Sequence, residues 1–261
     1  MTKMDATILS IDVGNTSVAF GVIRGQRVQA VQMVLTTLKS EIFSQQTDRM
    51  IKKVFKKYPK IEAVVICSVV PQVLKRVLRT LKRNSQRPVY VLGKDLIVPI
   101  QNNYKVPAQV GQDRLVCAYA VKMLYGYPAV VIDFGTAITF DFISARGFYE
   151  GGIIVPGIQM STESLFKKTA LLPNIESFHG PASLIGKTTE DSILSGIFHG
   201  YGAMSDEVIR RISKQTNQKT KVILTGGYTK LIRKFIYTKN VIIEKDLVFK
   251  GIAAVYATLK I

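Results

Sequence analysis

This 261-residue chain carries DVGNT at residues 12–16 and DFGTA at residues 133–137, and its architecture can be inferred from this pair. Each segment follows a short apolar run that is typical of a buried strand, and the two lie about half a chain apart. In each, an aspartate ends the strand and a glycine lets the backbone approach a ligand closely. The pair predicts two phosphate-binding turns for a nucleotide triphosphate and its metal. Either segment alone is also compatible with an ordinary hairpin.

Around these turns, alternating and β-branched apolar residues predict a repeated order of strands and helices. In the first half, strands are expected at residues 6–12, 18–24, 27–35, 63–67 and 89–92, and helices at 40–58, 71–82 and 112–125. The pattern restarts at residue 129, with strands at 129–133, 138–143, 148–154 and 221–225, then a final helix at 247–259. This restart predicts two related α/β domains with a cleft between them. They comprise residues 1–126, against which the terminal helix 247–261 packs, and residues 127–246.

The composition indicates a folded protein, because 47% of the residues are hydrophobic and the length suits about one to two domains. The longest apolar stretch, residues 63–74, is too short to cross a bilayer, and no signal peptide is expected before Asp12. A cytoplasmic protein without a membrane partner is therefore expected. Cys67 and Cys117 lie among apolar residues and are expected to be buried packing residues.

The formal net charge of +18 raises the possibility of nucleic-acid binding. Most of the clustered cations, at residues 52–57 and 75–83, fall at helical spacing opposite apolar positions, which is typical of solvated helix faces. No alternation of aromatic and basic residues accompanies them, so a nucleic-acid partner is not expected. General attraction of anionic ligands such as ATP is the second interpretation of the charge. The GKT at residues 186–188 is not a P-loop, because the position five residues before Gly186 is Pro181.

Other segments occur in an order that resembles one known family. They are Tyr104, GQDR at 111–114, GG at 151–152, PG at 156–157, GKTTE at 186–190 and KDLVFKG at 245–251. Over nearly the whole chain this order is similar to that of the type III pantothenate kinases, in the superfamily of acetate kinase, sugar kinases, heat-shock proteins and actin. The resemblance implies two actin-like (ribonuclease H-like) domains with mixed sheets flanked by helices. It also implies ATP-dependent phosphorylation of (R)-pantothenate to 4'-phosphopantothenate, the first step of coenzyme A biosynthesis.

The resemblance assigns a role to individual residues. Asp113 is expected to be the general base that takes the proton from the primary hydroxyl of pantothenate, although an acid at this place can also be a helix cap. The residues expected to bind ATP are Asp12, Val13, Gly14, Asn15, Thr16, Ser17, Val18, Ala19 and Thr136. Those expected to bind pantothenate are Tyr104, Gly111, Gln112, Asp113, Arg114 and Thr189, with Thr188 as the alternative to Thr189.

Two cations and a partner subunit complete these expectations. Asp133 is expected to bind a monovalent cation, potassium or ammonium, and Asp12 to hold magnesium, which prefers carboxylate and water oxygens. The resemblance also implies a homodimer. The alternative function is a catalytically silent regulatory or accessory protein on the same fold. One position departs from the family pattern, since Ala19 stands where many relatives carry a larger or basic residue.

Overall fold

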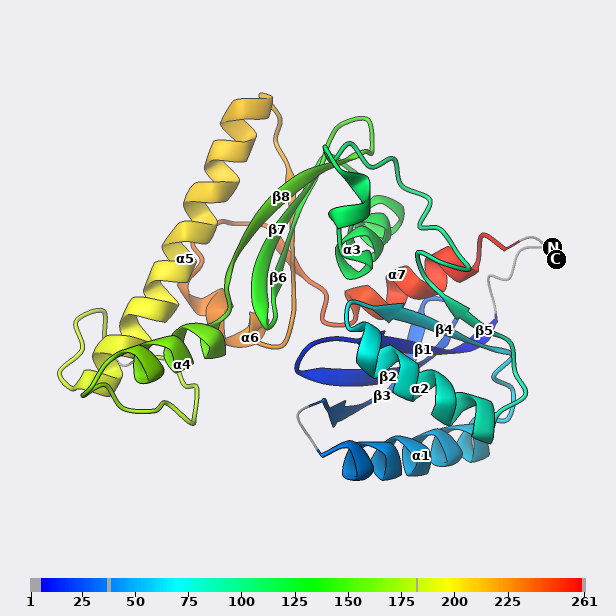
Figure 1. The fold of residues 1–261 in the computed structure, drawn as a ribbon. Coiled ribbons are helices and arrows are strands. Elements are labelled where there is room, and N and C mark those ends of the chain that lie inside the picture. Colours follow the sequence, from blue (N-terminus) through cyan, green and yellow to red (C-terminus); the bar gives the residue numbers. More distant parts are fainter. Residues whose placement is uncertain (1–5, 37–38, 182, 260–261) are drawn as a thin grey trace. The chain divides into compact units, whose positions relative to one another are not determined.

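The computed structural model describes residues 6–36, 39–181 and 183–259. It divides into two compact units (Figure 1). The first unit contains the residues up to Tyr125 together with those from Asp246 onward, and the second unit is Gly126–Lys245. Each unit is built around one five-stranded sheet.

The sheet of the first unit has the strand order β3-β2-β1-β4-β5. Its strands are β1 (Thr7–Val13), β2 (Ser17–Arg24), β3 (Arg27–Leu35), β4 (Ala63–Ser68) and β5 (Val89–Val91). The first three strands are antiparallel neighbours, while β4 and β5 run parallel to β1. In this register Asp12 of β1 lies beside Ala19 of β2 and Cys67 of β4.

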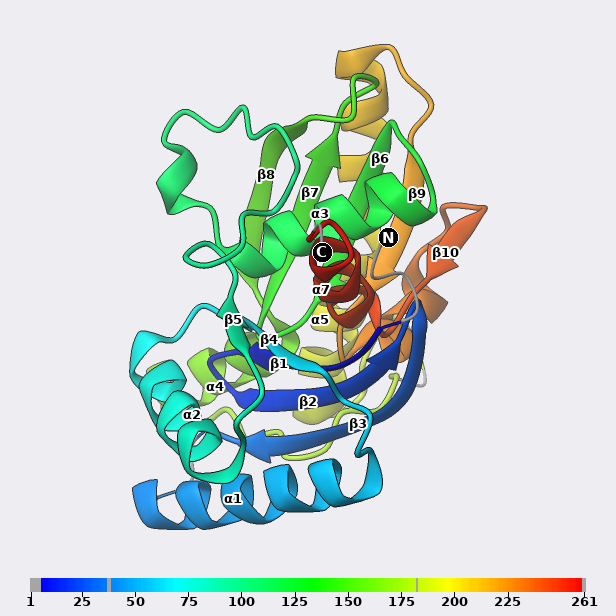
Figure 2. The same cartoon turned by 90° about the vertical axis from the view of Figure 1, so that its right-hand side faces the viewer.

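Helices cover both faces of this sheet. Helices α1 (Ser40–Lys57) and α2 (Pro71–Asn84) lie on one face, and α7 (Leu247–Tyr256) lies on the other (Figure 2). Helix α3 (Gln112–Leu124) packs against α7 and β4, and a short 3-10 helix, η1 (Pro107–Gln109), precedes it.

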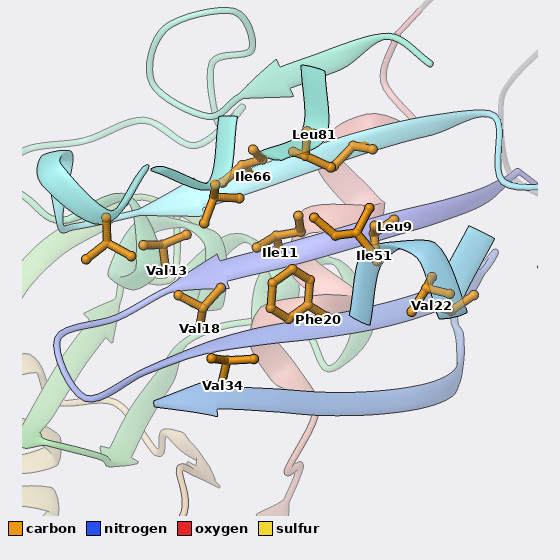
Figure 3. Close-up of a cluster of buried hydrophobic side chains, with 14 of the residues drawn as sticks. Leu9, Ile11, Val13, Val18, Phe20, Val22, Val34, Ile51, Ile66 and Leu81 are labelled. Atoms are coloured by element: carbon orange, nitrogen blue, oxygen red, sulfur yellow. The ribbon is translucent and has the colours of Figure 1, made fainter. Parts of the chain in front are cut away.

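Alternation along the strands divides the side chains between the two faces. Leu9, Ile11 and Val13 of β1 point into the core under α1 and α2, where they meet Phe20 of β2 and Ile51 of α1 (Figure 3). Because successive strand residues point to opposite faces, Asp12 belongs to the other face. On that face the chain approaches α7 closely, since a Cβ atom on Gly21 would lie 2.7 Å from the Phe249 ring.

The second unit repeats this arrangement with the strand order β10-β9-β6-β7-β8. Its strands are β6 (Ala129–Phe134), β7 (Ala137–Ile143), β8 (Tyr149–Pro156), β9 (Lys221–Thr225) and β10 (Val241–Ile243). Again three strands form an antiparallel meander and two run parallel to the first of them. The predicted α/β class with mixed sheets is confirmed, and so is the repeat of architecture.

The helices of the second unit lie on the sheet face that carries Ile132, Phe134 and Phe140. They are α4 (Ile158–Lys168), α5 (Thr189–Thr216), α6 (Thr229–Ile232) and the 3-10 helix η2 (Arg233–Phe235). Helix α5 is the longest element of the unit and runs along the sheet (Figure 1). The opposite face of the strands carries Asp133 and Asp141, which alternate with those core residues.

The expected elements are present, with ends that differ by a few residues. Helix α2 continues to Asn84, and α7 ends at Tyr256, after which the last turn tightens through a bond from Thr258 N–H to the Val255 carbonyl. Strand β10 was not expected, because its apolar run has only three residues, whereas the equally short β5 was indicated by the four-residue apolar run 89–92. Within the described ranges we find no helix with the length and apolarity needed to span a membrane.

Candidate active site

The first predicted phosphate turn is the connection between β1 and β2. It is closed by a 3.0 Å bond from Gly14 N–H to the Ser17 carbonyl, and Thr36, after β3, donates its N–H to the Thr16 carbonyl at 3.0 Å. The Thr36 hydroxyl also donates to the Asn15 carbonyl. The side chains of Asn15 and Thr16 are exposed at the tip of the turn. The turn is therefore held from behind by backbone bonds while its tip stays accessible.

The apolar members of this segment point away from the tip. The side chains of Val13 and Val18 are fully buried in the core under α1 and α2. The two residues also face each other in the β1–β2 pairing, and the Val13 carbonyl accepts a hydrogen bond from the Val69 N–H at 3.1 Å. The polar residues at the tip are thus the ones whose side chains can reach phosphate oxygens.

Asp12 and Asp113 both lie near Cys67 in the first unit, although they are far apart in the sequence. Cys67 of β4 lies directly beside Asp12 of β1 and is fully buried. This burial is the largest cause that raises the pKa of its thiol well above the ordinary value of 9.0. The negative charges of Asp12 and Asp113 raise this pKa further. The carboxylate at the end of β1 and the one in the first turn of α3 therefore both lie within electrostatic reach of the thiol near the end of β4.

The start of α3 holds Asp113 in a defined position. Gly111 is the N-cap residue, and the Oδ1 atom of Asp113 accepts a hydrogen bond of 2.8 Å from the Arg114 N–H. A Cβ atom on Gly111 would lie 2.4 Å from that same oxygen and 3.4 Å from Val69. A larger residue at position 111 would therefore displace the carboxylate. The positive end of the helix dipole also favours the ionised carboxylate here.

The remaining predicted residues of this unit differ in how firmly they are held. The side chain of Gln112 packs over Gly93, whose φ of +80° places it in the region that favours glycine, and a Cβ atom there would lie 2.7 Å from Gln112 Cδ. Tyr104 lies half-buried in an otherwise largely exposed loop, where its N–H donates to Asn102 Oδ1 at 3.0 Å. The loop that carries Tyr104 is thus shaped locally by an asparagine side chain.

The second predicted phosphate turn connects β6 and β7 and is enclosed by Gly157. This residue donates its N–H to the Thr136 carbonyl at 3.1 Å. A Cβ atom on Gly157 would lie 2.2 Å from the Thr136 oxygen and 2.6 Å from the Gly135 oxygen. The start of α4 therefore packs directly on the turn, and only a glycine allows this approach.

Gly226 encloses the other side of the same turn. It follows β9 with a φ of +95°, and a Cβ atom there would lie 2.3 Å from Asp133 Oδ1 and 2.5 Å from the Phe134 carbonyl carbon. Next to it, the Tyr228 N–H donates to the Phe134 carbonyl at 3.1 Å. The sequence analysis did not identify Gly157 and Gly226 as neighbours of Asp133 and Thr136. The contact joins segments distant in the chain, so no local signal pointed to it.

A second carboxylate on this sheet face was missed by sequence reasoning. Asp141 is only 2% exposed, and its two oxygens accept hydrogen bonds from Tyr149 Oη at 2.7 Å and Thr139 Oγ1 at 3.0 Å. Thr139 in turn lies directly opposite Asp133 in the β6–β7 pairing. Because a buried polar group is costly without hydrogen-bond partners, these two donors help to stabilise the buried carboxyl group of Asp141.

The segment with Thr188 and Thr189 forms the start of α5. Thr188 is the N-cap residue: its hydroxyl oxygen accepts from the Asp191 N–H at 3.1 Å and its O–H donates to Asp191 Oδ2 at 2.9 Å. Thr189 is the first residue of the helix and is exposed. No described strand leads into Gly186, so the rejection of a P-loop is confirmed.

The polar groups at both turns fit cations that take part of their coordination from a bound phosphate. In residues 6–36, 39–181 and 183–259 no three acidic, histidine or cysteine side chains gather as a metal cage. Single carboxylates such as Asp12 and Asp133 suit magnesium and monovalent cations, which complete their shells with phosphate, carbonyl and water oxygens.

Comparison with known proteins points to one family. The family profile described as "Type III pantothenate kinase" matches residues 8–211. A type III pantothenate kinase of Persephonella marina is 40% identical over 257 residues, which cover 96% of this chain and 98% of the relative. Another, from Halalkalibacterium halodurans, is 37% identical and covers 95% of this chain and 98% of the relative.

Solved structures with much lower identity show the fold alone. The ethanolamine utilization protein EutJ of Carboxydothermus hydrogenoformans superimposes with a TM-score of 0.52 at 12% identity, covering 95% of this chain and 89% of its own. Component A of the (R)-2-hydroxyglutaryl-CoA dehydratase of Acidaminococcus fermentans gives 0.51 at 11%, with coverages of 97% and 96%. These similarities confirm the predicted actin-like fold class.

Proposed function

The chain belongs to the type III pantothenate kinase family, and from this premise we infer its reaction and the residues that carry it. The protein transfers the terminal phosphoryl group of ATP to (R)-pantothenate, which yields 4'-phosphopantothenate in the first step of coenzyme A biosynthesis. The observation that carries this function is the 40% identity to a type III pantothenate kinase along 96% of the chain.

Asp113 acts as the general base. Phosphoryl transfer requires that the attacking hydroxyl be oriented and relieved of its proton. In the proposed step Asp113 accepts the proton of the primary hydroxyl while that oxygen bonds to the γ-phosphorus and the bond to the departing ADP oxygen breaks. Its position at the first turn of α3, with Gly111 leaving room for the carboxylate, supports this role.

ATP is held by the two turns. In the first turn, Gly14 lets the backbone come close to the phosphates, and Asn15, Thr16 and Ser17 offer side-chain donors. Val13, Val18 and Ala19 have no polar side-chain group and contribute backbone only. In the second unit, Thr136 contacts the nucleotide, and Gly157 and Gly226 shape the turn that presents it. Backbone N–H groups in tight turns are well suited to anionic phosphates.

The cations offset the charge of the triphosphate when they are bound. Asp12 holds magnesium, and Asp133 holds the monovalent cation, potassium or ammonium. The close approach of Gly226 to Asp133 supports the second assignment, because it keeps backbone atoms next to the carboxylate with no side chain in between.

Pantothenate is contacted by Tyr104, Gly111, Gln112 and Arg114 in the first unit, and by Thr189 in the second. Thr189 is preferred to Thr188 because the hydroxyl of Thr188 is already used to cap α5. The protein works as a homodimer in the cytoplasm. Its two domains are residues 1–126 with the helix 247–261, and residues 127–246.

Purified protein with ATP, magnesium, potassium and pantothenate tests these assignments through the release of ADP. Asp113→Asn is expected to lower kcat by about 10²- to 10⁴-fold, the usual contribution of a general base. Glu41→Gln removes an exposed carboxylate from the first turn of α1 in the same unit and is expected to leave kcat unchanged. Circular dichroism of both variants checks the fold.

Two results would contradict the proposal at different points. Turnover of Asp113→Asn within a few-fold of the unmodified protein would remove Asp113 as the base but leave the reaction intact. Absence of any ADP release from the unmodified protein would instead favour the silent regulatory protein.

A further inference from the structure

A second anionic site is suggested by a hollow of about 500 Å³ between α1 and α2 in the first unit. Four of its seven lining residues are cationic: Arg76, Arg79, Lys82 and Arg83. The others are Ser40, Ser44 and Thr80. Three of the cations, at positions 76, 79 and 83, follow the spacing of one helix face, so α2 presents them together to the hollow.

The four cations are not neutralised locally. None of them forms an ion pair with any residue that the structure describes. The nearby carboxylate of Asp48 is already engaged, with Lys52 at 2.8 Å and Asn84 Nδ2 at 2.7 Å. These two hydrogen bonds hold the pKa of Asp48 below its ordinary value, and Arg83 adds only a smaller electrostatic effect. The hollow therefore keeps a surplus of positive charge, and like charges at this spacing disfavour the helix unless a ligand balances them.

The hydroxyl groups in the lining narrow the choice of ligand. Ser44 Oγ donates to the Ser40 carbonyl at 2.8 Å, and Thr80 Oγ1 donates to the Arg76 carbonyl at 3.1 Å. Their protons are thus used within the helices, so the donors left for a ligand belong to the four charged side chains and to the hydroxyl of Ser40. A neutral sugar or polyol would find few partners here, whereas an anion would find several.

The size and shape of the hollow favour a small ligand. Its volume falls within the range of small-molecule sites, about 300 to 1,000 Å³. Guanidinium groups match phosphate oxygens in pairs, and several guanidinium groups around one hollow suit more than one phosphate. A single-stranded nucleic acid would require aromatic platforms for its bases, and none of the lining residues is aromatic.

We propose that this hollow between α1 and α2 binds a compact polyphosphate, either inorganic or carried by a small molecule. It is separate from the kinase site, because α1 and α2 cover the sheet face opposite to the one that carries Asp12. The proposal also gives a use to part of the net charge of +18, which phosphoryl transfer does not require.

Inorganic tripolyphosphate is the probe, titrated calorimetrically at low salt against three forms of the full chain. The first is the unmodified protein, and the second is the arginine variant Arg79→Gln/Arg83→Gln. The third, the lysine variant Lys214→Gln/Lys219→Gln, is a control with the same change of charge, and it replaces two exposed lysines near the C-terminal end of α5 and just beyond it. The arginine variant loses two charge contacts to the ligand, so its Kd for tripolyphosphate is expected to rise about tenfold, while the lysine variant keeps the Kd of the unmodified protein. Orthophosphate is expected to bind the unmodified protein more weakly than tripolyphosphate.

Binding of tripolyphosphate at the nucleotide site is common to all three proteins, so only the difference between the variants tests the hollow. An unchanged KM for ATP in both variants verifies that the kinase site is intact. If Arg79→Gln/Arg83→Gln does not fold, Arg76→Gln/Lys82→Gln replaces it.

Three outcomes would overturn the proposal. Equal weakening in the arginine and lysine variants would mean a general effect of net charge, and no weakening in either would mean that the hollow is not used. Tighter binding of a single-stranded thymidine oligonucleotide that depends on the same arginines would identify a nucleic-acid surface instead.

Discussion

At Gly157 the absence of a side chain determines whether the β6–β7 turn can form. The φ of this residue is −73°, which any residue can adopt, so the requirement for glycine is purely steric. The same holds in part for Gly111 beside Asp113, while Gly226 combines a close approach with a positive φ. Three glycines thus shape the surroundings of Asp113, Asp133 and Thr136.

Gly157→Ala is expected to destabilise the protein by about 1 to 3 kcal/mol, the usual cost of overpacking, and to raise the KM for ATP. The added methyl group would lie 2.2 Å from the Thr136 oxygen and must push the turn aside. Thermal unfolding and steady-state kinetics measure the two effects.

Gly196→Ala provides the matched control. A Cβ atom at Gly196, inside α5, would meet no atom within 4 Å beyond its own turn of helix, so this change is expected to stabilise the helix by about 0.5 to 1 kcal/mol. If Gly157→Ala behaved like Gly196→Ala, the steric argument would be refuted.

At the scale of single elements, the start of α5 separates a structural threonine from a candidate substrate contact. The Thr188 hydroxyl accepts from the Asp191 N–H, one of the groups that a helix leaves unpaired at its first turn, and donates to the Asp191 carboxylate. Thr189 takes no part in this cap.

The two threonines are therefore expected to respond differently to mutation. Thr188→Ala should lower the free energy of unfolding by about 1 kcal/mol, the usual value of an N-cap, with little change in the KM for pantothenate. Thr189→Val should raise that KM and leave stability nearly unchanged. Urea unfolding and initial-rate kinetics distinguish these effects, and the opposite pattern would assign the substrate contact to Thr188.

At the scale of the whole molecule, the burial of Cys67 links the acids of the site to global stability. The fold keeps its thiol neutral, because burial, Asp12 and Asp113 all raise its pKa. Cys117, the other cysteine, is also buried, as the sequence predicted for both.

This burial predicts a loss of stability in alkali. The folded-state pKa is raised, so the contribution of Cys67 is complete below its ordinary pKa of 9.0 and is lost as the pH rises above it, where only the unfolded chain releases the proton. At about pH 10, one unit above the unfolded pKa, the loss is expected to be about 1.4 kcal/mol, given 1.36 kcal/mol per pH unit. Urea unfolding at about pH 7.5 and about pH 10 measures it.

Cys67→Ala isolates this effect from the titration of other groups. The variant is expected to lose less stability than the unmodified protein between the two pH values. Identical losses in both proteins would show that the thiol does not contribute.

Much of the architecture was predictable from local patterns. The alternating apolar residues of β1, β2 and β3 and the helical spacing of α1 and α2 were visible in consecutive residues, and the restart at residue 129 indicated the second sheet. Strand β10 escaped prediction because its apolar run ends after three residues, one fewer than the run that indicated β5.

Within the candidate site, sequence reasoning named Asp12, Asp113 and Asp133, and their roles stay predictions. It did not find the hydrogen bonds from Tyr149 and Thr139 to Asp141, nor that Thr188 uses its hydroxyl for the helix cap. These features depend on where side chains point after folding.

The amino-acid order alone was sufficient for the α/β class, the duplicated strand–turn–strand plan and the family, because periods of two and 3.6 residues and short motifs are properties of neighbouring positions. Folding was needed to bring Gly157 and Gly226 onto the β6–β7 turn and to bring Asp12 and Asp113 within reach of Cys67. Such contacts join residues that are remote along the chain, and their closeness follows from how the strands and helices pack.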